Sequence, residues 1–244
     1  MRYKCIVKYD GSNFHGFQTQ LNKRTVQEEI EKALFNMHKE KTNIFACSRT
    51  DSHVHALGQV IHFDSFLDIS EYNMKEAINS GLPSDVYVSE VHKVDRSFHS
   101  QHNVVEKEYH YLIDLGDYNP LFYNYRLYPD RKVDVELMEE ASKIFIGEHD
   151  FKTFTKNHES KSTVKNIYSI EFVRNDDLLC IKFIGNSFLY NMIRIMVAML
   201  LEVGYHHIMV SDLQKALEAK DRKYAPKLAS GNGLYLVRVK YQDE

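Results

Sequence analysis

The sequence predicts an α+β fold built from two related sheet-and-helix halves whose sheets are largely antiparallel. Segments that alternate apolar and polar residues recur in both halves, which is typical of half-buried strands. Amphipathic helices lie between these segments, and hairpin-like strand pairs replace a strict alternation of strand and helix. The chain has 244 residues, 43% of them hydrophobic, so it is long enough to bury a sizeable core.

The first half, residues 1–104, is predicted to form an N-terminal α+β domain. Met1–Tyr9 alternates as a strand, and Asp10–Asn13 has the composition of a turn. Thr25 and Glu28 match a capping box at the start of an amphipathic helix. The remaining elements are expected at Ile44–Cys47, Gln59–Phe63, Tyr72–Asn79 (a helix) and Val86–Val91. This β-α-β-β-α-β order is that of a ferredoxin-like unit.

The second half, residues 105–244, repeats the mixture and is predicted to form a C-terminal α+β domain. A strand is expected at Glu108–Leu115 and a helix at Asp134–Ile146, ended by Gly147. Two further strands form a hairpin across Arg174–Asp177. These two strands are Val164–Val173 and Leu178–Ile184. The other expected elements are a strand at Leu234–Tyr241, a helix at Ser187–Val203, and a helix capped by Ser211.

The helix predicted at Ser187–Val203 is apolar almost all round, so it should be buried on most sides. It is shorter than the ~20 residues that a membrane-spanning helix requires. Tyr190, Asn191 and Arg194 are expected to share one of its faces. A buried guanidinium needs a carboxylate or several acceptors, so Arg194 is predicted to have a partner. A bond to helix-end carbonyls is the structural alternative.

Composition limits the function classes. The 31 basic and 34 acidic residues give a net charge of −3, so a polyanion would have to bind a local patch. Two patches are candidates, with a solvated charged face as the alternative and the commoner outcome: Lys152, Lys156, Lys161 and Lys165, and Lys220, Arg222, Lys223 and Lys227. The three cysteines fit free thiols, and no secretion signal is visible, so the cytoplasm is expected.

Residues 48–64 place one carboxylate, Asp51, among polar neighbours between two apolar runs. Arg49, Thr50, His53 and His55 are expected to share its loop, which connects two strands. A polar loop on a rigid scaffold is where chemistry is usually found. An ordinary turn is the alternative interpretation, because Ser, Thr and Asp hydrogen-bond their own backbone well.

Six motifs in order along the chain resemble the TruA-type pseudouridine synthases, and together they cover nearly the whole sequence. The motifs are Tyr9–Gln18, Arg49–Asp51 followed by Val54–Ala56 and Gly58–Val60, Tyr109–Tyr111, Gly147–Phe151, Met192–Arg194 within Phe188–Gly204, and Gly233–Leu236. The resemblance implies the pseudouridine synthase fold and isomerisation of uridine in the 38–40 region of the tRNA anticodon stem-loop. It also implies an enzyme without a cofactor or metal that acts as a cytoplasmic homodimer, with RNA as its partner and no membrane.

By that resemblance Asp51 is the catalytic aspartate, Tyr109 lies beside the target base, and Arg194 is the ion-pair partner of Asp51. A carboxylate beside the sugar can attack carbon or remove the C2′ proton, and both routes stay open. A nearby arginine would keep the carboxylate ionised. A tyrosine ring can stack on an extruded base. The residues expected to contact RNA are Arg49, His55, Lys152, Lys156 and Arg222.

The chain departs from the family pattern at a few positions of the loop and the entrance. Ser48 and His53 replace glycines, Ser52 replaces a small apolar residue, and Gln101 stands where an arginine is usual. Glu106 and Glu108 stand where basic residues are common. Because these changes leave Asp51 and its proposed partners intact, they bear on the RNA target more than on the chemistry. Ribosomal RNA is therefore the alternative substrate.

Two readings from other classes compete with an isomerase. A non-catalytic RNA-binding or folding module would keep its activity without Asp51. A metal-dependent hydrolase would use His53 and His55 with Asp51 or His62. No Cys-x-x-Cys or His-Glu-x-x-His pattern accompanies these histidines.

Overall fold

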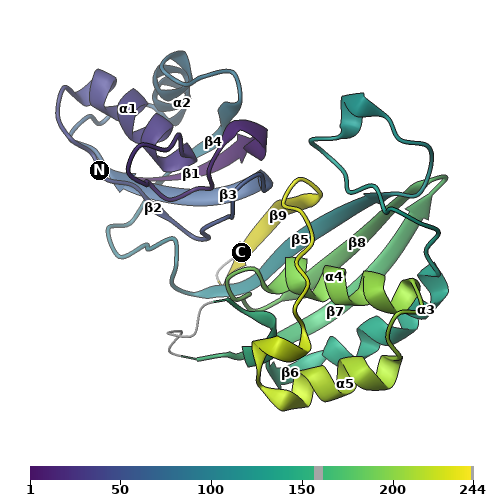
Figure 1. Cartoon of the computed structure of the whole chain (residues 1–244). Coiled ribbons are helices and arrows are strands. Elements are labelled where there is room, and N and C mark those ends of the chain that lie inside the picture. Colours follow the sequence, from purple (N-terminus) through teal and green to yellow (C-terminus); the bar gives the residue numbers. More distant parts are fainter. Residues whose placement is uncertain (157–161, 243–244) are drawn as a thin grey trace. The chain divides into compact units, whose positions relative to one another are not determined.

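A computed structural model describes residues 1–156 and 162–242, and the chain divides into two compact units (Figure 1). Unit 1 contains Met1–Val105 and Tyr235–Glu244, and unit 2 contains Glu106–Leu234. The predicted limits, 1–104 and 105–244, differ from this division at residue 105 and in residues 235–244. The last strand joins unit 1 because Tyr235 and Leu236 pair in parallel with His55 and Ala56.

The sheet of unit 1 has the strand order β4-β1-β3-β9, and β2 pairs with β3. One side of β1 is buried without exception, since Tyr3, Cys5 and Val7 are each 0% exposed. The alternating residues Ile6 and Lys8 face the other way. The strands are β1 (Arg2–Tyr9), β2 (Phe45–Ala46), β3 (His55–Asp64), β4 (Val86–Val94) and β9 (Leu234–Tyr241).

Two helices, α1 (Val26–His38) and α2 (Glu71–Ser80), cover one face of this sheet (Figure 1). Thr25 caps α1 as predicted, because its hydroxyl accepts a hydrogen bond from the Glu28 N–H at 3.4 Å. The order of elements through β4 is the predicted β-α-β-β-α-β. Strand β3 begins at His55, however, four residues before the predicted start at Gln59.

Unit 2 has the strand order β5-β8-β7-β6 with antiparallel pairing between β5, β8, β7 and β6. The predicted hairpin is confirmed as β7 and β8, and β6 is a short strand that the sequence reading missed. Both units therefore confirm the α+β class. The strands are β5 (Val104–Asp114), β6 (Gly147–Asp150), β7 (Val164–Asn175) and β8 (Leu178–Gly185).

The helices of unit 2 lie on one side of its sheet (Figure 1) and are α3 (Val135–Ser142), α4 (Met192–Gly204) and α5 (Val210–Ala219). Helix α3 ends in a 3-10 turn, Lys143–Phe145, rather than continuing to Ile146. Among the described residues, no helix has the length and apolar character that a membrane crossing requires.

Two helix starts were predicted wrongly. The apolar helix begins at Met192 rather than Ser187, because Asn191 adopts a left-handed conformation with φ of 62°. Tyr190 and Asn191 therefore precede the helix and do not share a helical face with Arg194. Helix α5 is capped at Met209 rather than Ser211, and the Asp212 carboxylate accepts a hydrogen bond from the Met209 N–H.

Candidate active site

Asp51 lies in the connection between β2 and β3 and is half-buried. The Val54 N–H donates to the Asp51 carbonyl at 3.2 Å, which closes a turn directly after the carboxylate-bearing residue. Arg49 is exposed, whereas its neighbours Ser48 and Thr50 are buried. The loop therefore anchors some side chains inside unit 1 and leaves Asp51 at its surface.

The N-terminal motif of the sequence braces this loop. The hydroxyls of Tyr9 and Thr50 are hydrogen-bonded at 2.7 Å, and the Phe17 N–H donates to the Thr50 carbonyl at 3.0 Å. Gly16 has φ of +98°, and a Cβ there would lie 2.8 Å from the Thr50 carbonyl oxygen. Burial raises the pKa of Tyr9, so its phenol stays protonated as a structural donor or acceptor.

His55 is placed differently from its predicted position in the loop. It is the first residue of β3, is 2% exposed, and its ring stacks on Tyr235 with centroids 4.6 Å apart. Its Nδ1 accepts a hydrogen bond from the Gly11 N–H at 3.0 Å and lies 3.3 Å from the Asp10 carboxylate. This buried imidazole positions the Asp10–Gly11 turn, so we withdraw His55 as an RNA contact.

Gln59 is a positioning residue that the sequence reading did not single out. It is 0% exposed, its amide N–H donates to the Ser48 carbonyl at 2.7 Å, and its Oε1 accepts from the Ser48 N–H at 3.2 Å. One buried side chain thus satisfies both backbone groups of Ser48. A glutamine directly before the apolar pair Val60–Ile61 was the available signal, because a buried amide requires such partners.

His53 occupies a left-handed backbone conformation with φ of 65°. That conformation suits the glycine found there in the family pattern, and histidine adopts it at some cost. Its Nδ1 hydrogen-bonds the Ser12 carbonyl at 2.8 Å, and the ring is exposed. The histidines of the alternative metal site therefore have separate structural partners. The described residues contain no group of three or more His, Cys, Asp or Glu suited to a metal ion.

In unit 2, Tyr109 lies on β5 with 8% of its surface exposed. The ring of Phe188 meets it edge-on, with centroids 5.3 Å apart. Two residues along the strand, Tyr111 is fully buried and donates its hydroxyl proton to the Ser230 carbonyl at 2.8 Å. A Cβ on Gly233 would lie 2.9 Å from the Tyr111 ring, which explains the glycine of the last sequence motif.

Arg194 is half-buried in the first turn of α4. Its Nε donates to the Ala229 carbonyl at 2.8 Å, and the Ala229 N–H donates to the Arg194 carbonyl at 3.1 Å. This reciprocal pair holds the guanidinium against the segment that leads to β9. The predicted need of Arg194 for an acceptor is thus met in part by a backbone carbonyl.

The structure brings the two predicted basic patches together. The 3-10 turn Lys152–Phe154 contacts the turn Arg222–Tyr224, and Lys220 pairs with Asp150 at 3.1 Å. Lys152 and Lys156 are exposed on this surface, whereas Lys161 lies outside the described residues.

Arg222 serves the local fold of this surface. It is half-buried, its Nη2 donates to the Lys227 carbonyl at 3.0 Å, and burial lowers its pKa. Within the described part of the chain, its Nε and Nη1 are buried without a hydrogen-bond partner.

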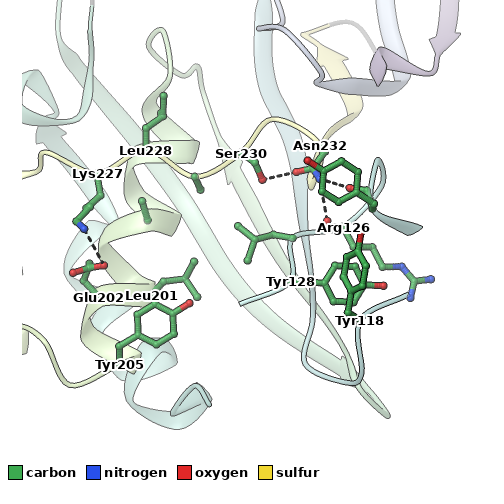
Figure 2. Close-up of a pocket in the computed structure, with 14 residues that line it drawn as sticks. Tyr118, Arg126, Tyr128, Leu201, Glu202, Tyr205, Lys227, Leu228, Ser230 and Asn232 are labelled. Carbon is green, nitrogen blue, oxygen red and sulfur yellow. Dashed lines mark hydrogen bonds and ion pairs between the residues drawn. The ribbon is translucent and has the colours of Figure 1, made fainter. Parts of the chain in front are cut away.

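A pocket of about 540 Å³ lies elsewhere in unit 2 (Figure 2). Tyrosine side chains dominate its wall, and an ion pair between Lys227 and Glu202 (3.8 Å) closes one side. The Asn232 amide donates to the carbonyls of Tyr123 and Arg126 and so fixes the loop that carries most of these rings. The aromatic lining residues are Tyr118, Tyr123, Tyr128 and Tyr205.

A family model described as tRNA pseudouridine synthase matches residues 5–103 and 141–242. Tyr109 lies in the stretch between these two ranges. The tRNA pseudouridine synthase A of Listeria monocytogenes serotype 4b is 47% identical over 246 residues, which is 99% of both chains. The protein of the same name from Geobacillus sp. strain WCH70 is 42% identical and also covers 99% of both chains.

Among solved structures, a Cbf5-Nop10-Gar1 complex aligns with a TM-score of 0.35 and 12% identity over 81% of this chain and 54% of the other. That likeness is too distant to carry an argument. The family-model match and the two relatives are enough to establish the family. The chain therefore belongs to the tRNA pseudouridine synthase family and has the pseudouridine synthase fold that its sequence predicted.

Proposed function

We propose that this protein is an isomerase that converts uridine to pseudouridine in tRNA, in the 38–40 region of the anticodon stem-loop, without a cofactor. The observation that carries the proposal is the placement of Asp51. This carboxylate belongs to the Arg-Thr-Asp signature and is half-buried in a loop whose neighbouring residues are hydrogen-bonded to Tyr9, Phe17 and Gln59. Family membership supports the reaction, and the names of the relatives support tRNA as substrate.

The reaction moves uracil from its N1 attachment to a C5 attachment on the same sugar. The bond between C1′ and N1 breaks, the base turns, a bond between C1′ and C5 forms, and the C5 proton leaves while N1 gains one. Asp51 either attacks the sugar carbon or removes the C2′ proton to give a glycal. Both routes require an ionised carboxylate, so both require Asp51 in its deprotonated form.

We assign the other two catalytic roles from the family motifs. Tyr109 stacks against the target base, and its hydroxyl is available to relay the proton released from C5. Arg194 keeps Asp51 ionised as its ion-pair partner. Arg49, Lys152 and Lys156 contact the RNA backbone, which suits their exposed positions.

Replacing Asp51 with asparagine tests the proposal. The amide keeps the size of the side chain but cannot act as a nucleophile or base, so we expect isomerisation to fall by about 10³-fold or more while RNA binding persists. Tritium release from C5-labelled uridine in an anticodon stem-loop measures the reaction, and filter binding measures affinity. Unchanged tritium release in the variant would show that the protein acts through another residue. A wild-type protein that binds RNA without releasing tritium would favour the non-catalytic module.

Pseudouridine mapping in cells that lack the gene tests the substrate. Loss of the modification from the anticodon stem-loop of tRNA is the expected result. Loss confined to ribosomal RNA would keep the reaction and overturn the assignment of tRNA. The bacterial relatives, named as tRNA-modifying enzymes, support the cytoplasm as the location.

We also propose a homodimer, supported by exposed apolar side chains between residues 118 and 123, the segment that contributes Tyr118 and Tyr123 to the pocket. Leu121 is 78% exposed, Tyr118 61% and Tyr123 57%, an accumulation that is unusual on a monomer surface. Sedimentation velocity of Leu121→Asp should show a shift from dimer to monomer. Phe66→Asp, which places the same charge at another exposed apolar residue, in unit 1 and 64% exposed, is the matched control and should remain a dimer. A monomeric wild-type protein would refute the proposal.

A further inference from the structure

Two lysines extend the strand face that carries Tyr109. Lys107 precedes Tyr109 by two residues on β5, so both side chains point to the same side of the sheet, about 7 Å apart along the strand. Lys107 pairs with Gly185 on β8, and Gly185 pairs in turn with Ile167 on β7. Lys165 precedes Ile167 by two residues and shares its side of the strand. The register thus brings Lys107 and Lys165 to the same end of the same face.

Gly185 allows the Asn166 backbone and the Phe188 ring to pack closely against β8. It stands between the two lysine-bearing strands, and a Cβ there would lie 2.7 Å from the Asn166 carbonyl oxygen and 3.3 Å from the Phe188 ring. Phe188 is also the ring that meets Tyr109 edge-on. The residues around Tyr109 are therefore packed tightly on one side, and the lysines stand at the end of the packed face.

Lys165 is not compensated by an acid. It is half-buried, and within the described residues its ammonium has no ion-pair partner. Burial, together with the charge of Lys107, lowers its pKa. The charge of Lys165 is partly shielded from water and lies near a like charge, and both effects cost free energy in the free protein. A bound anion would offset that cost.

We propose that Lys107 and Lys165 bind a backbone phosphate of the RNA next to the nucleotide whose base meets Tyr109. This inference rests on the proposed function. It gives Lys107 and Lys165 the role of positioning the RNA at Tyr109. Phosphate is the anion that an RNA substrate supplies, and lysines bind it as compact point charges. The contact would fix the position of the sugar relative to Tyr109 and would not depend on the identity of the base.

Substitutions at Lys165 test the proposal. Lys165→Gln should raise the Kd for an anticodon stem-loop about 5- to 20-fold and reduce the slope of log Kd against log salt by about 0.7 to 1. Lys165→Arg should bind within about twofold of the wild type. Lys215→Gln is the matched control, because Lys215 is exposed on α5 and already paired with Asp212. Thermal unfolding should show Lys165→Gln to be at least as stable as the wild type, because it removes a repulsion.

A modified RNA makes the test specific. One uncharged methylphosphonate linkage is placed on either side of the target uridine in turn. At one of these positions the methylphosphonate should weaken wild-type binding by at least the factor seen for Lys165→Gln. It should weaken binding by the Lys165→Gln variant less than it weakens binding by the wild type, because only Lys107 then remains at the phosphate. Additive effects at both positions, or an unchanged salt slope, would overturn the phosphate site. Failure of the proposed function would show itself separately, as absent tritium release by the wild type with binding intact.

Discussion

The Asp51 loop and the Tyr109 strand are held in place by different forces. Polar contacts position the loop: the Tyr9 hydroxyl and the Gln59 amide hydrogen-bond Thr50 and Ser48, and the His55 ring hydrogen-bonds Gly11 in the turn beside the loop. Ring packing contributes to the position of Tyr109, which is 8% exposed and meets the Phe188 ring edge-on, on a strand whose next inward residue, Tyr111, is fully buried. The loop should therefore respond to changes of geometry and protonation, whereas the strand should respond to changes of volume.

Among changes that compare the two regions, the largest expected effect comes from placing a methyl group beside the loop. Gly11→Ala would set its Cβ against the Val54 carbonyl, a contact too close to be relieved without moving the turn. We expect a loss of about 2–4 kcal/mol in the free energy of unfolding and about a 10²-fold loss of isomerisation rate. Urea denaturation and tritium release measure the two quantities.

Gly233→Ala is the counterpart in unit 2, where the new methyl group would press on the Tyr111 ring and the Leu112 carbonyl. It should lower stability by about 1–3 kcal/mol, with a smaller loss of rate in the folded protein. Equal losses of rate in the two alanine variants would contradict the distinction between a loop held by polar contacts and a strand held by packing.

Most of the fold could be predicted from the sequence, but few of these positioning contacts could. Strand alternation and the capping residues Thr25 and Asp134 predicted element type and order, because those signals are local. The start of α4 was missed because the left-handed turn at Asn191 interrupts an apolar run without changing its composition. The pairing of β9 with β3 could not be predicted from local pattern, since the strands are far apart in the sequence.

The candidate site shows the same division. Asp51, Tyr109 and Arg194 were named from motifs, and the structure shows how the chain holds each one within its own unit. His55 was misjudged because a histidine beside a catalytic motif resembles a ligand until its burial is known. Lys107 and Lys165 carry no motif that marks them as a pair, and only strand register brings them together.

As the pH falls, we expect unit 1 to lose stability at a higher pH than unit 2. The buried histidines among the described residues, His38, His55 and His62, all belong to unit 1. Burial, with a smaller effect of Arg2, lowers the pKa of His62 to about 4, and burial also lowers the pKa of His38. A group whose pKa is lower in the folded state stabilises the fold above its unfolded pKa of ~6.5, and that stability is lost as the pH falls towards 4.

For His62 the loss should amount to about 2–3 kcal/mol between pH 7 and pH 4. Hydrogen exchange read by mass spectrometry at pH 7 and pH 4.5, corrected for the intrinsic rate, should show protection lost first in β1, β3 and β4. His62→Gln removes the titrating group and should flatten the pH dependence of those strands. Loss of protection in β7 and β8 at the same pH would contradict the comparison of the two units.

The smallest effect is expected at His53, where strain and a hydrogen bond oppose each other. Glycine would relieve the left-handed conformation but lose the bond to the Ser12 carbonyl, whereas alanine would lose the bond and keep the strain. His53→Gly should therefore be more stable than His53→Ala by about 1 kcal/mol, with the wild type between them. Thermal unfolding of the three proteins measures the order. Because glycine preserves the turn, isomerisation by His53→Gly should stay within about threefold of the wild type, and equal stabilities for the glycine and alanine variants would show that position 53 is not strained in solution.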